Sequence, residues 1–163
     1  MRSVDDIDWG RWAPAEHATL LFVIRDGRIL LIHKKRGLGA GKINGPGGRI
    51  EAGETAQECA VREVGEELRI RPLGVRYAGR LNFQFADGFS IRGEVFTATD
   101  FEGEPTETDE ATPLWFPVDR LPFERMWADD PLWMPLMFAG RRFEGRFVFD
   151  GDRMLDHRLQ VVD

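Results

Sequence analysis

Apolar positions along the chain repeat with two different periods, which predict a set of strands and one central helix. Runs that are continuously apolar, or that alternate apolar and polar residues, are typical of strands. They cover residues 18–25, 28–34, 75–85, 91–99, 142–149 and 154–162. The dipeptides Asp26-Gly27, Asp87-Gly88 and Asp150-Gly151 lie between consecutive runs and are typical of hairpin turns. The pattern therefore predicts three hairpins.

The segment between the first and second hairpins has the helical period. Val64 and Leu68 lie four residues apart on one apolar face. Thr55 and Glu58 have the spacing of a capping box, which predicts the start of the helix at residue 56. Pro72 predicts that the helix ends a few residues before it.

A second group of helical signals occurs towards the C-terminus. A helical turn is expected from residue 118, and helix signals mixed with prolines cover residues 123–138. Strands lie before and after the first helix, and the second helix lies near the end of the chain. This order predicts an α/β fold in which a mixed sheet carries helices on both sides.

The first helix carries three acidic residues on one face. Glu63, Glu66 and Glu67 are spaced i, i+3 and i+4, so their side chains gather together. Like charges at this spacing destabilise an isolated helix by about 0.2–0.5 kcal/mol per pair. A divalent cation would reverse that effect, and carboxylate oxygens suit Mg²⁺ or Mn²⁺. For the triplet alone, a solvated acidic face is the alternative interpretation.

A glycine-rich loop precedes this helix. Residues 36–48 include six glycines in thirteen positions, and such a loop can bring backbone N–H groups close to phosphates. Ile43 stands where a Walker A motif needs Ser or Thr, so that motif is excluded. A flexible connector is the alternative, but the position next to the acidic helix favours a binding loop.

Composition narrows the class of protein. The 163 residues are 42% hydrophobic and 31% charged, which fits one globular domain, here residues 17–163 after a leader of residues 1–16. A net charge of −6 argues against binding to polymeric nucleic acid, and no apolar run is long enough to span a membrane. Cys59 is the single cysteine, so an internal disulfide is excluded. We expect a cytoplasmic monomer.

The acidic helix is part of a longer motif. Its residues match the pattern G-x5-E-x7-R-E-U-x-E-E-x-G-U, in which U is apolar, at Gly48, Glu54, Arg62, Glu63, Val64, Glu66, Glu67 and Ile70. This pattern is the Nudix box, so the chain resembles the Nudix hydrolases. It departs from the box at Arg69, where the family has a glycine that eases the exit from the helix.

Segments outside the Nudix box resemble one particular branch of the family. The segments KKRGLGAGKINGPGGRIEAGET, LPFERMWADDPLWMPL and RRFEGRFVFDGDRMLDHRL resemble the oxidised purine nucleoside triphosphatases, the 8-oxo-dGTP diphosphatase branch. This resemblance implies the Nudix fold, an α/β/α sandwich around a mixed β-sheet. It also implies a Mg²⁺ site formed by the carbonyl of Gly47 and by Glu63, Glu66, Glu67 and Glu110, with Arg62 orienting the helix carboxylates.

The same resemblance implies a set of substrate-binding residues. Asn44, Asp129 and Asp130 match residues that recognise the purine edge. Trp127 and Phe83 match the walls on which the base stacks, and Thr19 and Lys34 match residues at the mouth of the pocket. Leu38, Ile43 and Pro46 replace residues that are aromatic in that branch, which implies weaker stacking and a different preferred base.

Asp129 and Asp130 have two interpretations. Adjacent acidic residues are by default a solvated turn. In a poorly solvated pocket, in contrast, they would share a proton, and moving that proton between them would present different hydrogen-bonding patterns to an oxidised guanine and an oxidised adenine.

These expectations combine into one leading function and two alternatives. The leading function is Mg²⁺-dependent hydrolysis of nucleoside triphosphates such as 8-oxo-dGTP and 2-oxo-dATP to a monophosphate and pyrophosphate, which would sanitise the nucleotide pool. Glu67 is favoured over Glu66 and Glu110 as the residue that orients or deprotonates the attacking water. The alternatives are another Nudix activity, on dinucleoside polyphosphates or ADP-ribose, and a binding domain without catalysis.

Overall fold

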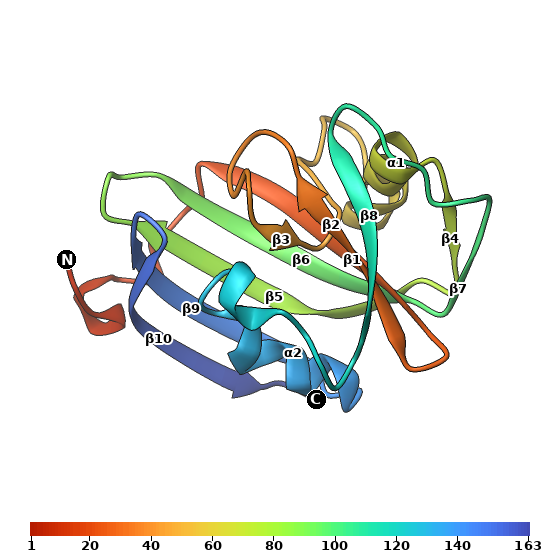
Figure 1. The fold of residues 1–163 in the computed structure, drawn as a ribbon. Helices are drawn as coiled ribbons and strands as arrows, with labels where there is room; N and C mark the ends of the chain where they lie inside the picture. The colour runs from red at the N-terminus through yellow and green to blue at the C-terminus, as the bar shows by residue number, and fades with distance from the viewer.

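A mixed β-sheet organises the computed structural model, which describes residues 1–163 (Figure 1). The strands are β1 (Glu16–Arg25), β2 (Arg28–Lys34), β3 (Ile43–Asn44), β4 (Arg71–Leu73), β5 (Arg76–Phe85), β6 (Ser90–Ala98), β7 (Asp100–Glu102), β8 (Ala111–Pro117), β9 (Phe143–Asp150) and β10 (Arg153–Val161). The helices are α1 (Ala56–Leu68) and α2 (Asp130–Phe138), with short 3-10 helices η1 (Val4–Asp6) and η2 (Phe123–Arg125).

The sheet has the order β10-β9-β5-β6-β1-β2-β3, and β8 pairs with β2. β1 runs parallel to β6 and β5 runs parallel to β9, whereas the other pairs in this sheet are antiparallel. β1 and β2 pair only at their turn, through Ile24 with Ile29 and Arg25 with Arg28. The hairpin therefore opens away from its turn, and the loop before α1 enters there, where Ala18 forms a bridge with Arg49.

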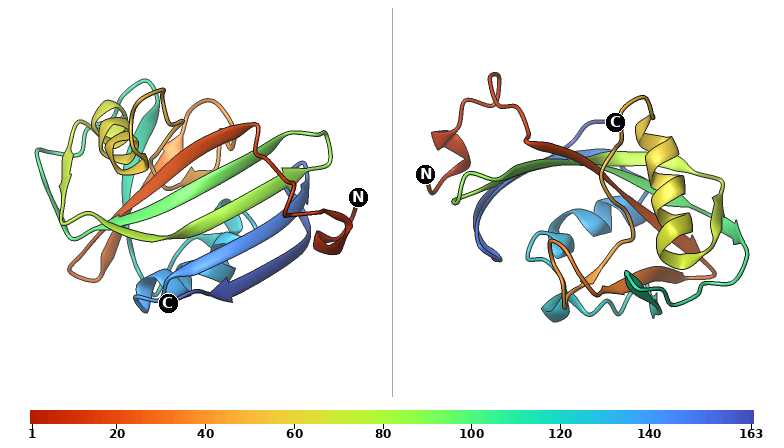
Figure 2. Two further views of the ribbon diagram at one scale, coloured as in Figure 1. Left: turned by 180° about the vertical axis from the view of Figure 1, so that it is seen from behind. Right: turned by 90° about the horizontal axis from the view of Figure 1, so that it is seen from above.

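The two faces of the sheet carry separate hydrophobic cores. Residues alternate between faces along a strand, so Leu21 and Val23 of β1 pack with α1, whereas Phe22 packs with α2. Val64 of α1 and Trp133 of α2 are both fully buried in these cores. Figure 2 shows the two helices on opposite sides of the sheet. The predicted α/β/α sandwich is confirmed.

The ends of α1 follow from local chemistry. The Thr55 hydroxyl accepts a hydrogen bond from the Glu58 N–H, and the Glu58 carboxylate accepts one from the Thr55 N–H, so the capping box is confirmed. The helix ends at Leu68, and Arg69 has the left-handed conformation, with φ of 62°. An arginine thus occupies a conformation that glycine adopts at lower cost.

Several predicted boundaries differ from the structure. β1 begins two residues before the expected start, and the glycine-rich loop includes the short strand β3, which the composition did not reveal. At the expected helical turn from residue 118 the chain makes a single hydrogen-bonded turn, in which the Arg120 N–H donates to the Pro117 carbonyl at 3.0 Å, and the 3-10 helix η2 follows at residues 123–125. Strands β4 and β7 form a separate two-stranded sheet that we did not predict. No helix is long and apolar enough to cross a membrane.

Candidate functional site

Three carboxylates gather beside the end of the glycine-rich loop. Oxygens of Glu63, Glu67 and Glu110 all lie within 4.8 Å of one another. Glu63 and Glu67 come from α1, whereas Glu110 comes from the loop that enters β8. Glu67 is only 5% exposed, and the hydrogen bond found for its carboxylate is a long one of 3.4 Å from the Gly47 N–H. Burial, and then the charge of Glu63, raise the pKa of Glu67 to about 8.

This donor set fits a divalent cation. Three close carboxylates, one of them buried, are destabilised by mutual repulsion and by lost hydration. Hard oxygen ligands on two separate chain segments are the arrangement that Mg²⁺ or Mn²⁺ would stabilise. Lys34 also faces the group, and burial lowers the pKa of its ammonium while the three glutamates partly oppose that effect.

Arg62 of α1 joins the helix carboxylates to the loop that precedes the helix. Its guanidinium donates to both oxygens of Glu54, at 2.7 and 3.0 Å, and to Glu63 at 2.9 Å. It also donates to the carbonyl of Arg49 at 3.1 Å. Glu66 lies outside the group of three, since its half-exposed carboxylate pairs with Arg62 at 3.3 Å. The structure thus brings together three of the four glutamates expected at the metal.

The two glycines before the cluster are required by close contacts. A Cβ atom on Gly47 would lie 1.8 Å from the carbonyl oxygen of Thr19, and one on Gly48 would lie 2.3 Å from the carboxyl carbon of Glu63. Any side chain there would push the loop away from β1 or displace a cluster carboxylate. The structure therefore explains why glycine occupies both positions.

Thr19 lies elsewhere than expected. Its side chain is 1% exposed and points to the α1 side of the sheet, where the hydroxyl lies 3.4 Å from the Gly48 carbonyl and 3.4 Å from the Cys59 sulfur. The structure does not place Thr19 at a pocket mouth. Instead, its N–H donates to the Gly48 carbonyl at 2.8 Å, which holds the loop against β1.

A buried pair of carboxyls begins α2. Asp129 and Asp130 are 2% and 9% exposed, so neither is a solvated turn. The indole N–H of Trp133 donates to Asp129 at 2.8 Å. Burial raises the pKa of Asp129 to about 6, and burial together with the charge of Asp129 raises the pKa of Asp130 well above its ordinary value. Carboxyls that interact in this way titrate as a pair, and both shifts favour retention of a proton, so the pair can offer a donor as well as acceptors.

Trp127 and Asn44 meet beside this pair. A Cβ atom on Gly39 would lie 2.8 Å from the Trp127 indole nitrogen and 3.2 Å from the Asn44 side-chain oxygen. Asn44 donates to the Gly39 carbonyl at 3.4 Å, and the Trp127 carbonyl accepts from the Asp130 N–H at 3.1 Å. The glycine-rich loop therefore borders both this group of side chains, to which the resemblance assigns the base pocket, and, through Gly47, the carboxylate cluster.

Phe83 is half-buried on the α2 side of the sheet. Its ring stacks on Phe147 with centroids 5.2 Å apart and lies 6.0 Å from the ring of Phe149. Phe149 in turn packs edge-on against Trp127 at 5.6 Å. Phe83 thus belongs to the same aromatic group as Trp127, with Phe149 between them.

The positions with aliphatic replacements differ from one another. Leu38 is 47% exposed, whereas Ile43 is fully buried in the core that packs on α2. Pro46 is also buried, and its carbonyl accepts from the Leu21 N–H at 2.9 Å. Ile43 and Pro46 are therefore structural, and only Leu38 has an exposed side chain.

Comparison with known proteins decides the family. Residues 15–137, most of the chain, match the model of the NUDIX domain. The chain belongs to the Nudix family.

Two relatives of this Nudix protein extend the match to most of its length. It is 44% identical over 147 residues to an oxidized purine nucleoside triphosphate hydrolase of Danio rerio, covering 89% of this chain and 94% of the relative. It is 39% identical over 147 residues to the Mus musculus protein of the same name, and this match also covers 89% of this chain and 94% of the relative. A crystal structure of a MutT mutator protein from Bacillus halodurans is 28% identical, with a TM-score of 0.79, and the match covers 89% of this chain and 97% of that one.

Two further residues of this Nudix protein, Lys42 and Phe85, lie beside Trp127. The Lys42 ammonium lies 5.3 Å from the centre of the Trp127 ring and 3.3 Å from Asp152. Phe85 packs edge-on against Trp127 at 6.2 Å. The position of Lys42 in the glycine-rich loop was a signal that could have found it. From the sequence, Phe85 had two interpretations, as a core residue or as a residue that stacks on a base.

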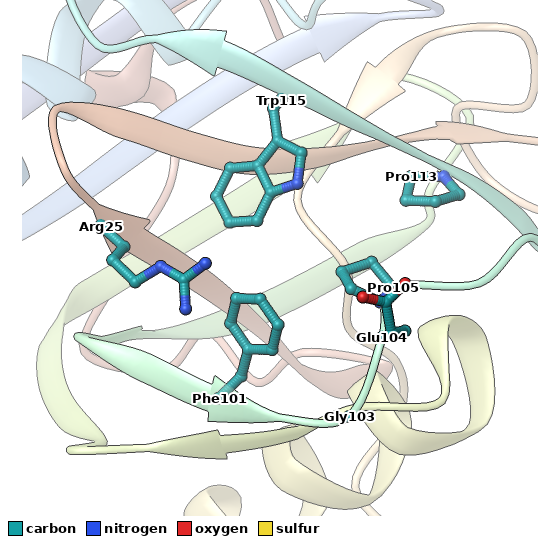
Figure 3. A pocket seen from close by; sticks show the side chains of 7 residues that line it. All are labelled: Arg25, Phe101, Gly103, Glu104, Pro105, Pro113 and Trp115. Atoms are coloured by element: carbon teal, nitrogen blue, oxygen red, sulfur yellow. The ribbon is translucent and has the colours of Figure 1, made fainter.

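A separate cavity of about 500 Å³ lies at the turn end of the β1–β2 hairpin (Figure 3). Arg25, Phe101 and Trp115 line it, and none of its lining residues belongs to the carboxylate cluster or the pocket beside Trp127. Arg25 is already engaged there, since its guanidinium lies 4.5 Å from the Phe101 ring centre and 2.8 Å from Asp100. We therefore assign the candidate site to the carboxylates and the aromatic pocket.

Proposed function

We propose that this Nudix protein hydrolyses oxidised purine nucleoside triphosphates to a nucleoside monophosphate and pyrophosphate. The observation that carries the proposal is the shared glycine-rich loop, which borders a carboxylate cluster at Gly47 and an aromatic pocket with two buried carboxyls at Gly39 and Asn44. A nucleotide needs both features, one for its phosphates and one for its base. The names and coverage of the two vertebrate relatives support the same activity.

The carboxylate cluster would hold Mg²⁺, or Mn²⁺, through Glu63, Glu67 and Glu110. When bound, the ion would neutralise negative charge on the phosphate oxygens of the substrate. Arg62 would keep Glu63 in place, and its pairing with Glu66 would hold that carboxylate near the cluster. Glu67 would orient the attacking water or accept its proton, because it is the most buried carboxylate of the three.

The aromatic pocket would recognise the base. The rings of Trp127 and Phe83 would stack on the purine. Stacking of this kind does not depend strongly on which base is bound. The edge of the base would then be distinguished by hydrogen bonds to Asn44, Asp129 and Asp130. One ionised and one protonated carboxyl would present an acceptor and a donor side by side. The position of the shared proton, on Asp129 or on Asp130, would then determine whether the pair bonds an oxidised guanine or an oxidised adenine.

A hydrolysis screen in which the nucleotide products are separated and identified tests this proposal, because only the triphosphates would release pyrophosphate. The purified protein would be assayed with Mg²⁺ on 8-oxo-dGTP, 2-oxo-dATP, dGTP, ADP-ribose and diadenosine polyphosphates. We expect the highest kcat/KM on the oxidised triphosphates, loss of turnover in Glu67→Gln, and normal turnover in Glu124→Gln, a matched change of an exposed carboxyl. Higher kcat/KM on ADP-ribose or diadenosine polyphosphates would replace this function with another Nudix activity. No hydrolysis of any of these compounds would favour a binding domain.

A further inference from the structure

The N-terminal segment before β1 is attached to the rest of the protein by specific contacts. Val4 is 2% exposed, and the Asp156 carboxylate of β10 accepts from its N–H at 2.7 Å and from the Ser3 hydroxyl at 2.9 Å. Figure 1 shows this segment beside β9 and β10, at the end of the sheet where β5 turns into β6. The segment lies before residue 15, where the match to the family model begins.

Two tryptophans in this segment pack against each other, with ring centres 5.1 Å apart, but their indole N–H groups have different partners. The Trp9 indole N–H donates to the Val4 carbonyl at 2.9 Å, so its hydrogen bond stays within the segment. The Trp12 indole N–H donates to the Gln84 side-chain oxygen of β5 at 2.9 Å. The Arg92 guanidinium lies 5.5 Å from the Trp12 ring centre. Trp12 is thus the tryptophan whose indole N–H is bonded outside the segment, to the large sheet.

The Gln84 side chain connects Trp12 to the β5–β6 turn through hydrogen bonds. Its amide nitrogen donates to the carbonyls of Phe85 and Phe89, at 3.0 and 3.2 Å. These carbonyls belong to the two residues that close the turn, since the Phe85 N–H donates to the Phe89 carbonyl at 2.8 Å. A further bond, from the Ala15 N–H to the Ser90 hydroxyl at 2.9 Å, holds the segment to the other end of the same turn.

The turn carries part of the aromatic pocket. The Phe85 and Phe89 rings lie 5.8 Å apart, and Phe85 packs edge-on against Trp127 at 6.2 Å. A side chain whose orientation sets a binding wall must itself be held by its neighbours. A contiguous set of hydrogen bonds and ring contacts therefore leads from Trp12 through Gln84 and Phe85 to the wall on which the base would stack.

We propose that Trp12 is a positioning residue for the base pocket, acting through Gln84 on the β5–β6 turn. This inference rests on the proposed function, because the pocket is assigned there to a purine base. Trp12 does not touch the substrate. Its indole N–H orients the Gln84 amide, and the Gln84 amide fixes the turn that places Phe85 against Trp127.

Matched substitutions of the two tryptophans test the proposal. Trp12→Phe and Trp9→Phe each remove one indole N–H and keep an aromatic ring, but only the first breaks the contact to Gln84. We expect Trp12→Phe to raise KM for 8-oxo-dGTP by roughly threefold to tenfold, the factor that a lost hydrogen bond is worth in an equilibrium constant. The kcat value should stay unchanged, and Trp9→Phe should change neither constant.

A double-mutant cycle identifies the route of the effect. Gln84→Met removes the amide through which Trp12 would act, so adding Trp12→Phe to that variant should raise KM no further. Independent, multiplied effects of the two substitutions would overturn the route through Gln84. Equal KM values for the Trp12→Phe and Trp9→Phe variants would overturn the positioning role itself.

Hydrogen exchange separates this inference from the proposed function. Exchange of the Phe85 and Gly88 amides, which both form bonds within the turn, can be measured without substrate. We expect faster exchange in Trp12→Phe than in Trp9→Phe. If none of the triphosphates is hydrolysed, the proposed function fails, and with it the pocket role of Trp12. The exchange data still decide whether Trp12 holds the turn, and unchanged exchange overturns that link.

Discussion

Glu67→Gln should stabilise the metal-free protein while abolishing its activity. The sequence predicted that Glu67 belongs to a cluster of mutually repelling carboxylates, but it did not predict that the side chain is buried. The structure buries Glu67 to 5% exposure between two other carboxylates. Glutamine has nearly the same shape, can accept the hydrogen bond from the Gly47 N–H through its carbonyl, and carries no charge to bury.

The size of this effect follows from the pKa of Glu67. In the folded protein without metal, burial and the charge of Glu63 raise that pKa from 4.5 to about 8. The unfolded chain therefore loses its proton at lower pH than the folded chain, and the folded state is progressively destabilised as pH rises from about 4.5 to about 8. Between pH 5.5 and pH 8, this group destabilises the fold by about 3 kcal/mol, at about 1.4 kcal/mol for each pH unit.

Thermal unfolding in EDTA measures this contribution. A free-energy change of about 3 kcal/mol corresponds to a Tm change of roughly 6–12 °C for a protein of this size. We expect the Tm of Glu67→Gln to exceed that of the wild type by an amount that increases from pH 5.5 to pH 8. Glu66→Gln is the matched control, because the Glu66 side chain is 51% exposed and should leave the pH dependence as it is.

Magnesium provides the complementary measurement. Since a bound divalent cation would offset the repulsion among the three carboxylates, adding Mg²⁺ should raise the Tm of the wild type at pH 8. The gain should be much smaller in Glu67→Gln, and its turnover of 8-oxo-dGTP should fall by orders of magnitude. Parallel pH profiles for the wild type and Glu67→Gln in EDTA would refute the argument that Glu67 is a destabilised buried acid.

The remaining predictions concern the loop and the base pocket. Gly48→Ala should weaken activation by Mg²⁺ because its methyl group would displace the Glu63 carboxylate, and a Mg²⁺ titration of turnover that matches the wild type would contradict this. Phe83→Ala should weaken nucleotide binding by roughly 1–3 kcal/mol through lost stacking, which raises KM with little change in kcat; a Tm loss without a KM change would make the ring purely structural. Asp129→Asn and Asp130→Asn should each alter the ratio of kcat/KM for 8-oxo-dGTP and 2-oxo-dATP between pH 6 and 9, and a ratio equal to that of the wild type at every pH would remove the pair from base recognition.

Local interactions allowed the sequence alone to determine much of this protein. The capping box at Thr55, the helical period of α1 and the hairpin turn at Asp26-Gly27 each depend on residues within a few positions of one another. The same short range places Glu63 and Glu67 on one helix face, so the spacing of these residues was enough to predict the acidic half of the site. The order of strands and helices along the chain likewise predicted a mixed sheet covered on both faces.

Tertiary structure decided which of these groups work together. It added Glu110 to the cluster, left Glu66 paired with Arg62, and turned Thr19 towards α1. It also buried Asp129 under the Trp133 indole, where a sequence rule favours a solvated turn. These outcomes depend on which segments, distant along the chain, come to lie together and on how far each group is removed from water. Neither the period of apolar residues nor the spacing of a motif carries that information.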